Sequence, residues 1–236
     1  MTRKLPVSCL AFALVLAAGP GLACGWWGES IGETTLKSVV TNKSDLAKLD
    51  TSTPEGMARM AHAYRLGQGV PQDDLVARRW MTRAARAGHV GAMNDLGQML
   101  EMGIGGPEDQ TEAARWYESA AEAGNAMARH SLAMMLFEGR GVARNPQRAE
   151  RFLRLAAQGG HKSAATDLAD RIWDGEIAPK EPHEGCLWSL VAEKLGADGG
   201  AENCRGREPD LGDAALAELE QRATDAVQAI EKKGQS

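Results

Sequence analysis

The sequence repeats itself every 36 residues, and this period limits the possible folds more than any other feature. Aromatic residues recur at this interval, and so do two sets of glycines. The members are Trp80, Trp116, Phe152 and Trp188; Gly67, Gly103, Gly139 and Gly175; and Gly88, Gly124, Gly160 and Gly196. A repeat of this length is typical of solenoids, in which each unit completes its core only by stacking on its neighbours.

Each repeat has the pattern of two short helices joined by a turn. In the second repeat, Ala92, Leu96 and Leu100 recur every four residues and mark one apolar helix face. Gly103 can end that helix in a left-handed conformation, and Asp109 is a good N-cap for the next helix. We therefore predict an all-α solenoid of about four 36-residue helix-turn-helix repeats with a C-terminal capping helix.

The repeat resembles a known family. The second unit reads LGQMLEMGIGGPEDQTEAARWYESAAEAGN, which is similar to the Sel1-like repeat, a relative of the tetratricopeptide repeat. On this resemblance the repeats occupy residues 56–91, 92–127, 128–163 and 164–198. The fourth unit departs from the pattern at Trp173, Ile177 and Gly185, as terminal repeats often do.

The C-terminal residues 199–236 are expected to form a polar loop and then the capping helix. Apolar residues recur at helical spacing between Leu211 and Lys233. Cys186 and Cys204 are close in sequence, and we expect them to form a disulfide worth about 3 kcal/mol. Metal or redox chemistry is the alternative for these cysteines, but the sequence contains no CxxC motif.

The N-terminal residues 1–23 have the pattern of a secretory signal, with a basic start, an apolar core and small residues before the cut. We expect cleavage after Ala23 and export to the periplasm, with residues 24–55 as a linker leading into the solenoid. Cleavage leaves Cys24 first, either unmodified or lipidated, and lipid on Cys24 would be the only membrane attachment. The roles of Trp26 and Trp27 stay open.

Composition and motifs argue against several classes of function. The formal net charge is −5 and Lys and Arg are not clustered, so nucleic acid is not an expected partner. HExxH, P-loop and serine–lysine motifs do not occur, and we predict neither catalysis nor a cofactor or metal. His89 and His161 share a repeat column with Asn125, which indicates a structural role in a turn.

We predict instead a groove for a protein or peptide from the cell envelope, lined by polar residues and methionines of the first helices. The candidates are Arg59, His62, Arg65, Asn94, Asp95, Gln98, Arg129, His130, Met134 and Glu138. Met99 and Met135 either join this groove or pack between helices.

Two functions follow from the resemblance. The first is a non-catalytic interaction scaffold in the cell envelope. The second is a hydrolase or ligand-binding protein for cell-wall or β-lactam compounds, as among cysteine-rich Sel1-like relatives. The absence of cysteines in each repeat and of a serine–lysine motif counts against the second function.

Overall fold

The computed structural model of the chain describes residues 43–46 and 48–234. Residues 1–23, Cys24, Trp26 and Trp27 lie outside the described residues. The helices are α1 (Lys43–Leu46), α2 (Pro54–Leu66), α3 (Asp74–Arg86), α4 (Val90–Glu101), α5 (Gln110–Glu122), α6 (Ala126–Glu138), α7 (Pro146–Gln158), α8 (Lys162–Trp173), α9 (Glu184–Lys194), α10 (Gly200–Arg207) and α11 (Asp213–Gly234). The described part of the chain contains no strand.

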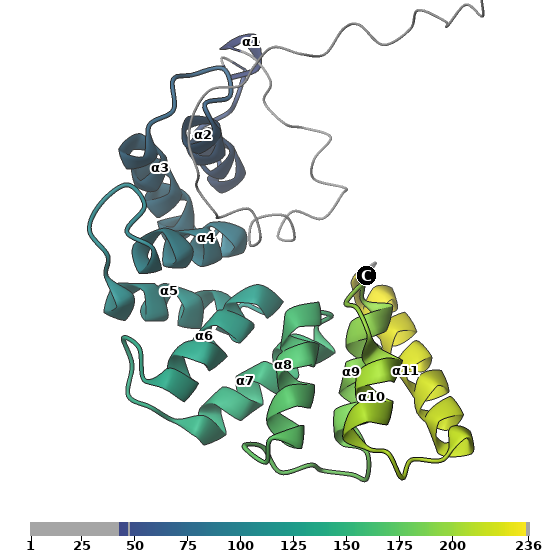
Figure 1. Ribbon diagram of the computed structural model, residues 1–236. Coiled ribbons are helices and arrows are strands. Elements are labelled where there is room, and N and C mark those ends of the chain that lie inside the picture. Colours follow the sequence, from purple (N-terminus) through teal and green to yellow (C-terminus); the bar gives the residue numbers. More distant parts are fainter. Residues whose placement is uncertain (1–42, 47, 235–236) are drawn as a thin grey trace, which may run out of the picture. The chain divides into compact units, whose positions relative to one another are not determined.

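The predicted all-α solenoid is confirmed. From α2 to α9, each helix packs on the next one along the chain. The first helices α2, α4, α6 and α8 form one layer and the second helices α3, α5 and α7 form the other, and Figure 1 shows the helix pairs following one another along an arc. The predicted repeat boundaries at 56, 92, 128 and 164 fall two residues inside the first helices, which begin at 54, 90, 126 and 162.

Side-chain caps set the start of each helix from α2 to α8. Asp109 Oδ1 accepts a hydrogen bond from the Glu112 backbone N–H at 2.8 Å, as predicted, and Asp73 and Asn145 cap α3 and α7 in the same way. The column of His89, Asn125 and His161 caps the first helices, because each side chain accepts a bond from the backbone N–H three residues later. The predicted turn role of this column is therefore an N-cap role.

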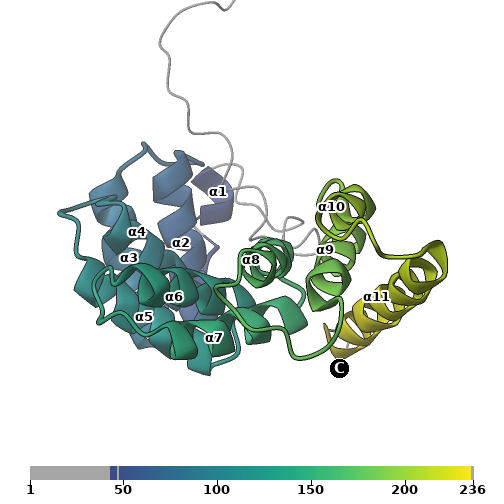
Figure 2. The same ribbon diagram turned by 60° about the horizontal axis from the view of Figure 1, so that its bottom comes forward.

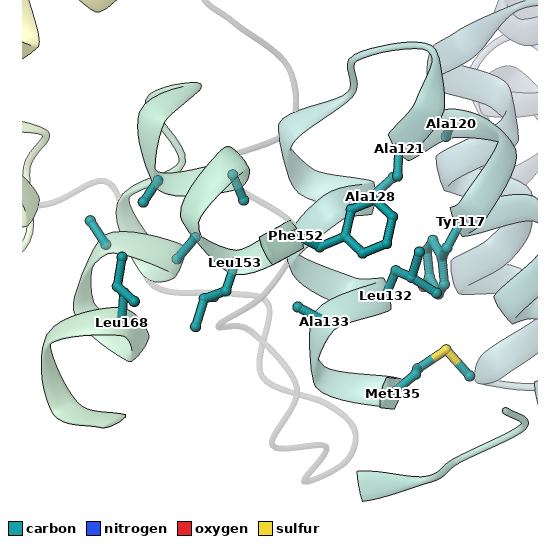
Figure 3. Close-up of a cluster of buried hydrophobic side chains, with 14 of the residues drawn as sticks. Tyr117, Ala120, Ala121, Ala128, Leu132, Ala133, Met135, Phe152, Leu153 and Leu168 are labelled. Atoms are coloured by element: carbon teal, nitrogen blue, oxygen red, sulfur yellow. The ribbon is translucent and has the colours of Figure 1, made fainter. Parts of the chain in front are cut away.

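The core lies between the two layers (Figure 3). Tyr117 is fully buried in this core, whereas the neighbouring Trp116 is only half-buried. Tyr117 fits because Gly97 faces it: a Cβ on Gly97 would lie 2.7 Å from Tyr117 Cε1. Met99 and Met135 are fully buried, so they pack between helices and do not line the predicted groove.

Ion pairs join the second helices of successive repeats, and their charges are reversed from one junction to the next. Glu118 of α5 pairs with Arg148 of α7, whereas Arg154 of α7 pairs with Glu184 of α9. The two pairs occupy equivalent positions, 36 residues apart. The side chains of Arg154 and Glu184 are only 7% and 6% exposed, compared with 36% and 38% for Arg148 and Glu118.

The C-terminal region caps the array. The predicted disulfide between Cys186 and Cys204 is confirmed. The expected polar loop around Cys204 is instead partly helical, as α10, because the disulfide and the close approach of Gly200 to the Ser189 carbonyl bring it against α9. The predicted capping helix is α11, which packs on α9 (Figure 2).

The unusual residues of the fourth repeat fit this cap. Trp173 lies against α9, and a Cβ on Gly185 would be 2.5 Å from Trp173 Nε1. The same Nε1 donates to Glu208 Oε1 at 3.0 Å, beyond α10. Trp173 and Gly185 therefore depart from the repeat pattern together. No helix in the described part of the chain is long and apolar enough to cross a membrane.

The buried pair predicts a pH-dependent loss of stability in Glu184→Gln. Burial raises the pKa of Glu184, but hydrogen bonds from the Lys180 N–H, Arg154 and Trp188 outweigh it and hold the pKa below 4.5. The contribution of the pair to stability is therefore fully present above pH 4.5. It is lost as the pH falls through the pKa of Glu184 in the folded chain, which is lower. We expect the substitution to cost about 3 kcal/mol at neutral pH and progressively less in acid, measured by urea unfolding.

The control is Glu118→Gln, which alters the equivalent but more exposed pair. We expect this change to cost less than about 1 kcal/mol. If both substitutions lowered the free energy of unfolding equally at neutral pH, burial would not make the Arg154–Glu184 pair the stronger of the two.

Candidate partner-binding surface

All ten predicted groove residues lie on the first helices. Arg59, His62 and Arg65 are on α2; Asn94, Asp95 and Gln98 are on α4; and Arg129, His130, Met134 and Glu138 are on α6. We call the layer of α2, α4, α6 and α8 the first-helix layer.

At the junction of α2 and α4, the predicted residues meet. His62 Nε2 lies 3.4 Å from Asp95 Oδ2. Arg59 instead bonds to Glu55 on its own helix, with 3.3 Å between Nε and Oε1. Burial lowers the pKa of Arg65, and the charges of Asp95 and Asp74 act in the opposite direction. This end of the layer therefore carries two arginines close to carboxylates.

At the junction of α4 and α6, two amide side chains meet a methionine. Asn94 Nδ2 and Gln98 Nε2 lie 3.5 Å and 3.6 Å from Met127 Sδ, a weak acceptor. Asn94 Nδ2 also donates to Asp95 Oδ1 at 3.2 Å. Asn94 is only 2% exposed, yet its Oδ1 has no hydrogen-bond partner among the described residues. Such a buried, unsatisfied carbonyl costs stability and is uncommon in native structures.

At the junction of α6 and α8, a histidine is held from two sides. His130 is 5% exposed, and its Nε2 lies 2.5 Å from Asp167 Oδ2. The His161 ring stacks on it, with centroids 4.8 Å apart. Met134 Sδ lies 3.8 Å from Arg171 Nη2. Polar contacts between neighbouring first helices therefore continue into the fourth repeat.

Two predicted residues serve other contacts. Arg129 Nε donates to the Ala121 carbonyl at 3.0 Å, which satisfies the end of α5. Glu138 pairs with Arg140 in the turn after α6. Conversely, sequence analysis missed Met127, Asp167 and Arg171. Asp167 could have been found, because it shares a repeat column with Asp95.

The fourth repeat gives the layer an acidic end. Asp167, Asp170 and Asp174 recur along α8 and at its C-cap. Burial, and then the charges of Asp167 and Asp174, raise the pKa of Asp170, whereas Arg207 opposes this change. The described residues include no group of three or more histidine, cysteine or acidic side chains placed to hold a metal ion.

Comparison with known proteins identifies the repeat. The family model described as Sel1 repeat matches residues 54–89, 90–125 and 126–161. These residues form three Sel1 repeats. The three matched units correspond to α2–α3, α4–α5 and α6–α7, and the fourth helix pair, α8–α9, follows them in the same order. Proteins with these repeats are generally protein-interaction scaffolds and typically non-catalytic.

Solved structures show the same fold. A Sel1 repeat protein from Oxalobacter formigenes is similar over 84% of each chain, with 20% identity and a TM-score of 0.67. The protein c5321, a protective antigen of uropathogenic Escherichia coli strains, is similar over 79% of this chain, with 21% identity and a TM-score of 0.64. This similarity covers 40% of the c5321 chain. No curated protein matches the sequence significantly.

The unsatisfied carbonyl of Asn94 predicts an unusual stability effect. Asn94→Leu removes a buried acceptor without a partner, and we expect the free energy of unfolding to rise by about 1 kcal/mol. His130→Leu is the matched control, because His130 occupies the same repeat column but has a partner in Asp167. We expect this second substitution to cost at least about 1 kcal/mol in urea unfolding. Equal destabilisation by both would show that the Asn94 carbonyl is satisfied in solution.

Proposed function

We propose that this Sel1 repeat protein is a non-catalytic scaffold of the bacterial cell envelope that binds a protein or peptide through its first-helix layer. The observation that carries the proposal is the buried, unsatisfied carbonyl of Asn94 beside Gln98 and Met127. A buried acceptor that costs stability because no described residue satisfies it is typical of a functional site. A methionine over two amides also suits an adaptable surface, because its thioether moves at little cost.

The two ends of the layer support recognition by charge. Arg59 and Arg65 lie on α2, whereas α8 presents the carboxylates of Asp167 and Asp170. Such a separation orients a partner along the layer and speeds its association. We therefore propose a partner segment with acidic groups near α2 and basic groups near α8.

The envelope location belongs to the same proposal. It is supported by the signal pattern of residues 1–23 and by the disulfide between Cys186 and Cys204, since disulfides persist in oxidising compartments. Membrane attachment would occur through a lipid on Cys24.

Charge reversal on α2 tests the function. We expect the double substitution Arg59→Glu and Arg65→Glu to abolish recovery of the partner in affinity purification from the native cell envelope, because two attractive charges become repulsive. The control reverses Arg79 and Arg115, which are exposed and share one repeat column on the second helices.

The control variant should recover the partner as the natural chain does. Circular dichroism of both variants establishes that they fold. Unchanged recovery with the α2 variant, or equal loss with both, would refute binding through the first-helix layer.

A further inference from the structure

A separate feature lies on α7, in the layer of second helices. It is a surface pocket of about 280 Å³, lined by a stripe of α7 side chains from Gln147 to Gln158 and by Lys180 from the turn before α9. Its volume is at the lower end of the range for small-ligand sites. None of the predicted groove residues contributes to it.

The wall of this pocket is fixed by the buried ion pair. Arg154 donates from Nε to Glu150 Oε1 at 2.8 Å and also bonds to Glu184. Glu184 in turn accepts a hydrogen bond from the Lys180 backbone N–H at 2.6 Å. The network therefore holds the backbone of Lys180 beside α7 without using the Lys180 ammonium.

Two cations of the pocket remain uncompensated. The charge of Arg154 is met by Glu150 and Glu184. By contrast, the side chains of Arg151 and Lys180 are exposed, and neither has a carboxylate partner in the part of the chain that the structure describes. The guanidinium of Arg151 lies near the Phe152 ring of its own helix, 5.7 Å from the ring centroid.

The second repeat lacks this positive character. The residue equivalent to Arg154 in the second repeat is Glu118, and the residue equivalent to Gln158 is Glu122. The counterpart of Arg151 in the second repeat is Arg115, which has these acidic residues on its own helix. The charge reversal between the two junctions thus produces a basic pocket on a chain of formal net charge −5.

We propose that this pocket binds a carboxylate, held between the Arg151 guanidinium and the Lys180 ammonium. A guanidinium presents paired N–H donors that match the two oxygens of a carboxylate, and an ammonium adds a point charge. Glu150 in the lining disfavours a more highly charged anion. The carboxylate comes from an acidic side chain of a peptide or from a free small acid. This site does not rest on the function proposed for the first-helix layer.

Isothermal titration calorimetry of the full chain at low ionic strength tests the site. The probes are glutarate and an N-acetylated, C-amidated peptide Gly-Glu-Gly-Glu-Gly, with the glutamine analogue of the peptide as a control for charge. We expect Arg151→Gln and Lys180→Gln each to weaken binding of the carboxylate probes about tenfold or more. Arg115→Gln, at the equivalent position of the second repeat, should leave binding unchanged.

The outcomes separate the two sources of the carboxylate. Tighter binding of the peptide than of glutarate supports a peptide ligand, and the reverse supports a free acid. The site is refuted if neither probe binds, if the glutamine peptide binds as tightly as the glutamate peptide, or if Arg115→Gln weakens binding as much as Arg151→Gln. Because no described residue forms an ion pair with Arg151 or Lys180, their variants should fold normally.

Discussion

Stacking of one short helix pair on the next is the interaction on which this structure depends. Each helix from α2 to α8 has 12 or 13 residues, a length that is marginal for an isolated helix in water. The pairs persist because alanines and glycines let them approach closely, as where Tyr117 fills the space beside Gly97. The C-terminal helices α10 and α11 both pack on α9, and the disulfide between Cys186 and Cys204 fastens α10 to α9.

The polar contacts between repeats serve two ends. Histidine–carboxylate contacts cross the α2–α4 junction, from His62 to Asp95, and the α6–α8 junction, from His130 to Asp167. They hold the first helices in register, and they also lie in the layer through which we propose that a partner binds. The charge-reversed pairs Glu118–Arg148 and Arg154–Glu184 do the same for the second helices, and they leave one basic pocket in the third repeat.

The fold could be predicted because its determinants are local and recur. A glycine after each first helix, an N-cap such as Asp109 and a small residue such as Ala120 have the same function in each repeat. Helix α10 could not be predicted, because its sequence is polar and only its packing on α9 shows why it is ordered. Likewise, the repeat pattern places Trp116 in a recurring aromatic column, but it does not show that the side chain of the neighbouring Tyr117 enters the core.

The candidate surface could be predicted only in part. The repeat pattern placed ten candidate residues on the first helices, where the structure also has them, but it could not show that Arg129 donates to the Ala121 carbonyl. Nor could it show that Asn94 Oδ1 would lack a donor among the described residues while Nδ2 points to Met127. Contacts between side chains of different repeats are properties of the stacked array.

Site-specific photo-cross-linking in the native cell tests the central claim, binding through the first-helix layer, most directly. A photoreactive amino acid replaces Arg59 on α2 in one variant and Arg115 on α5 in another, and both positions are accessible to solvent. The account predicts a discrete covalent adduct from position 59 and none from position 115. An adduct from position 115 alone, or none from either position, would contradict it.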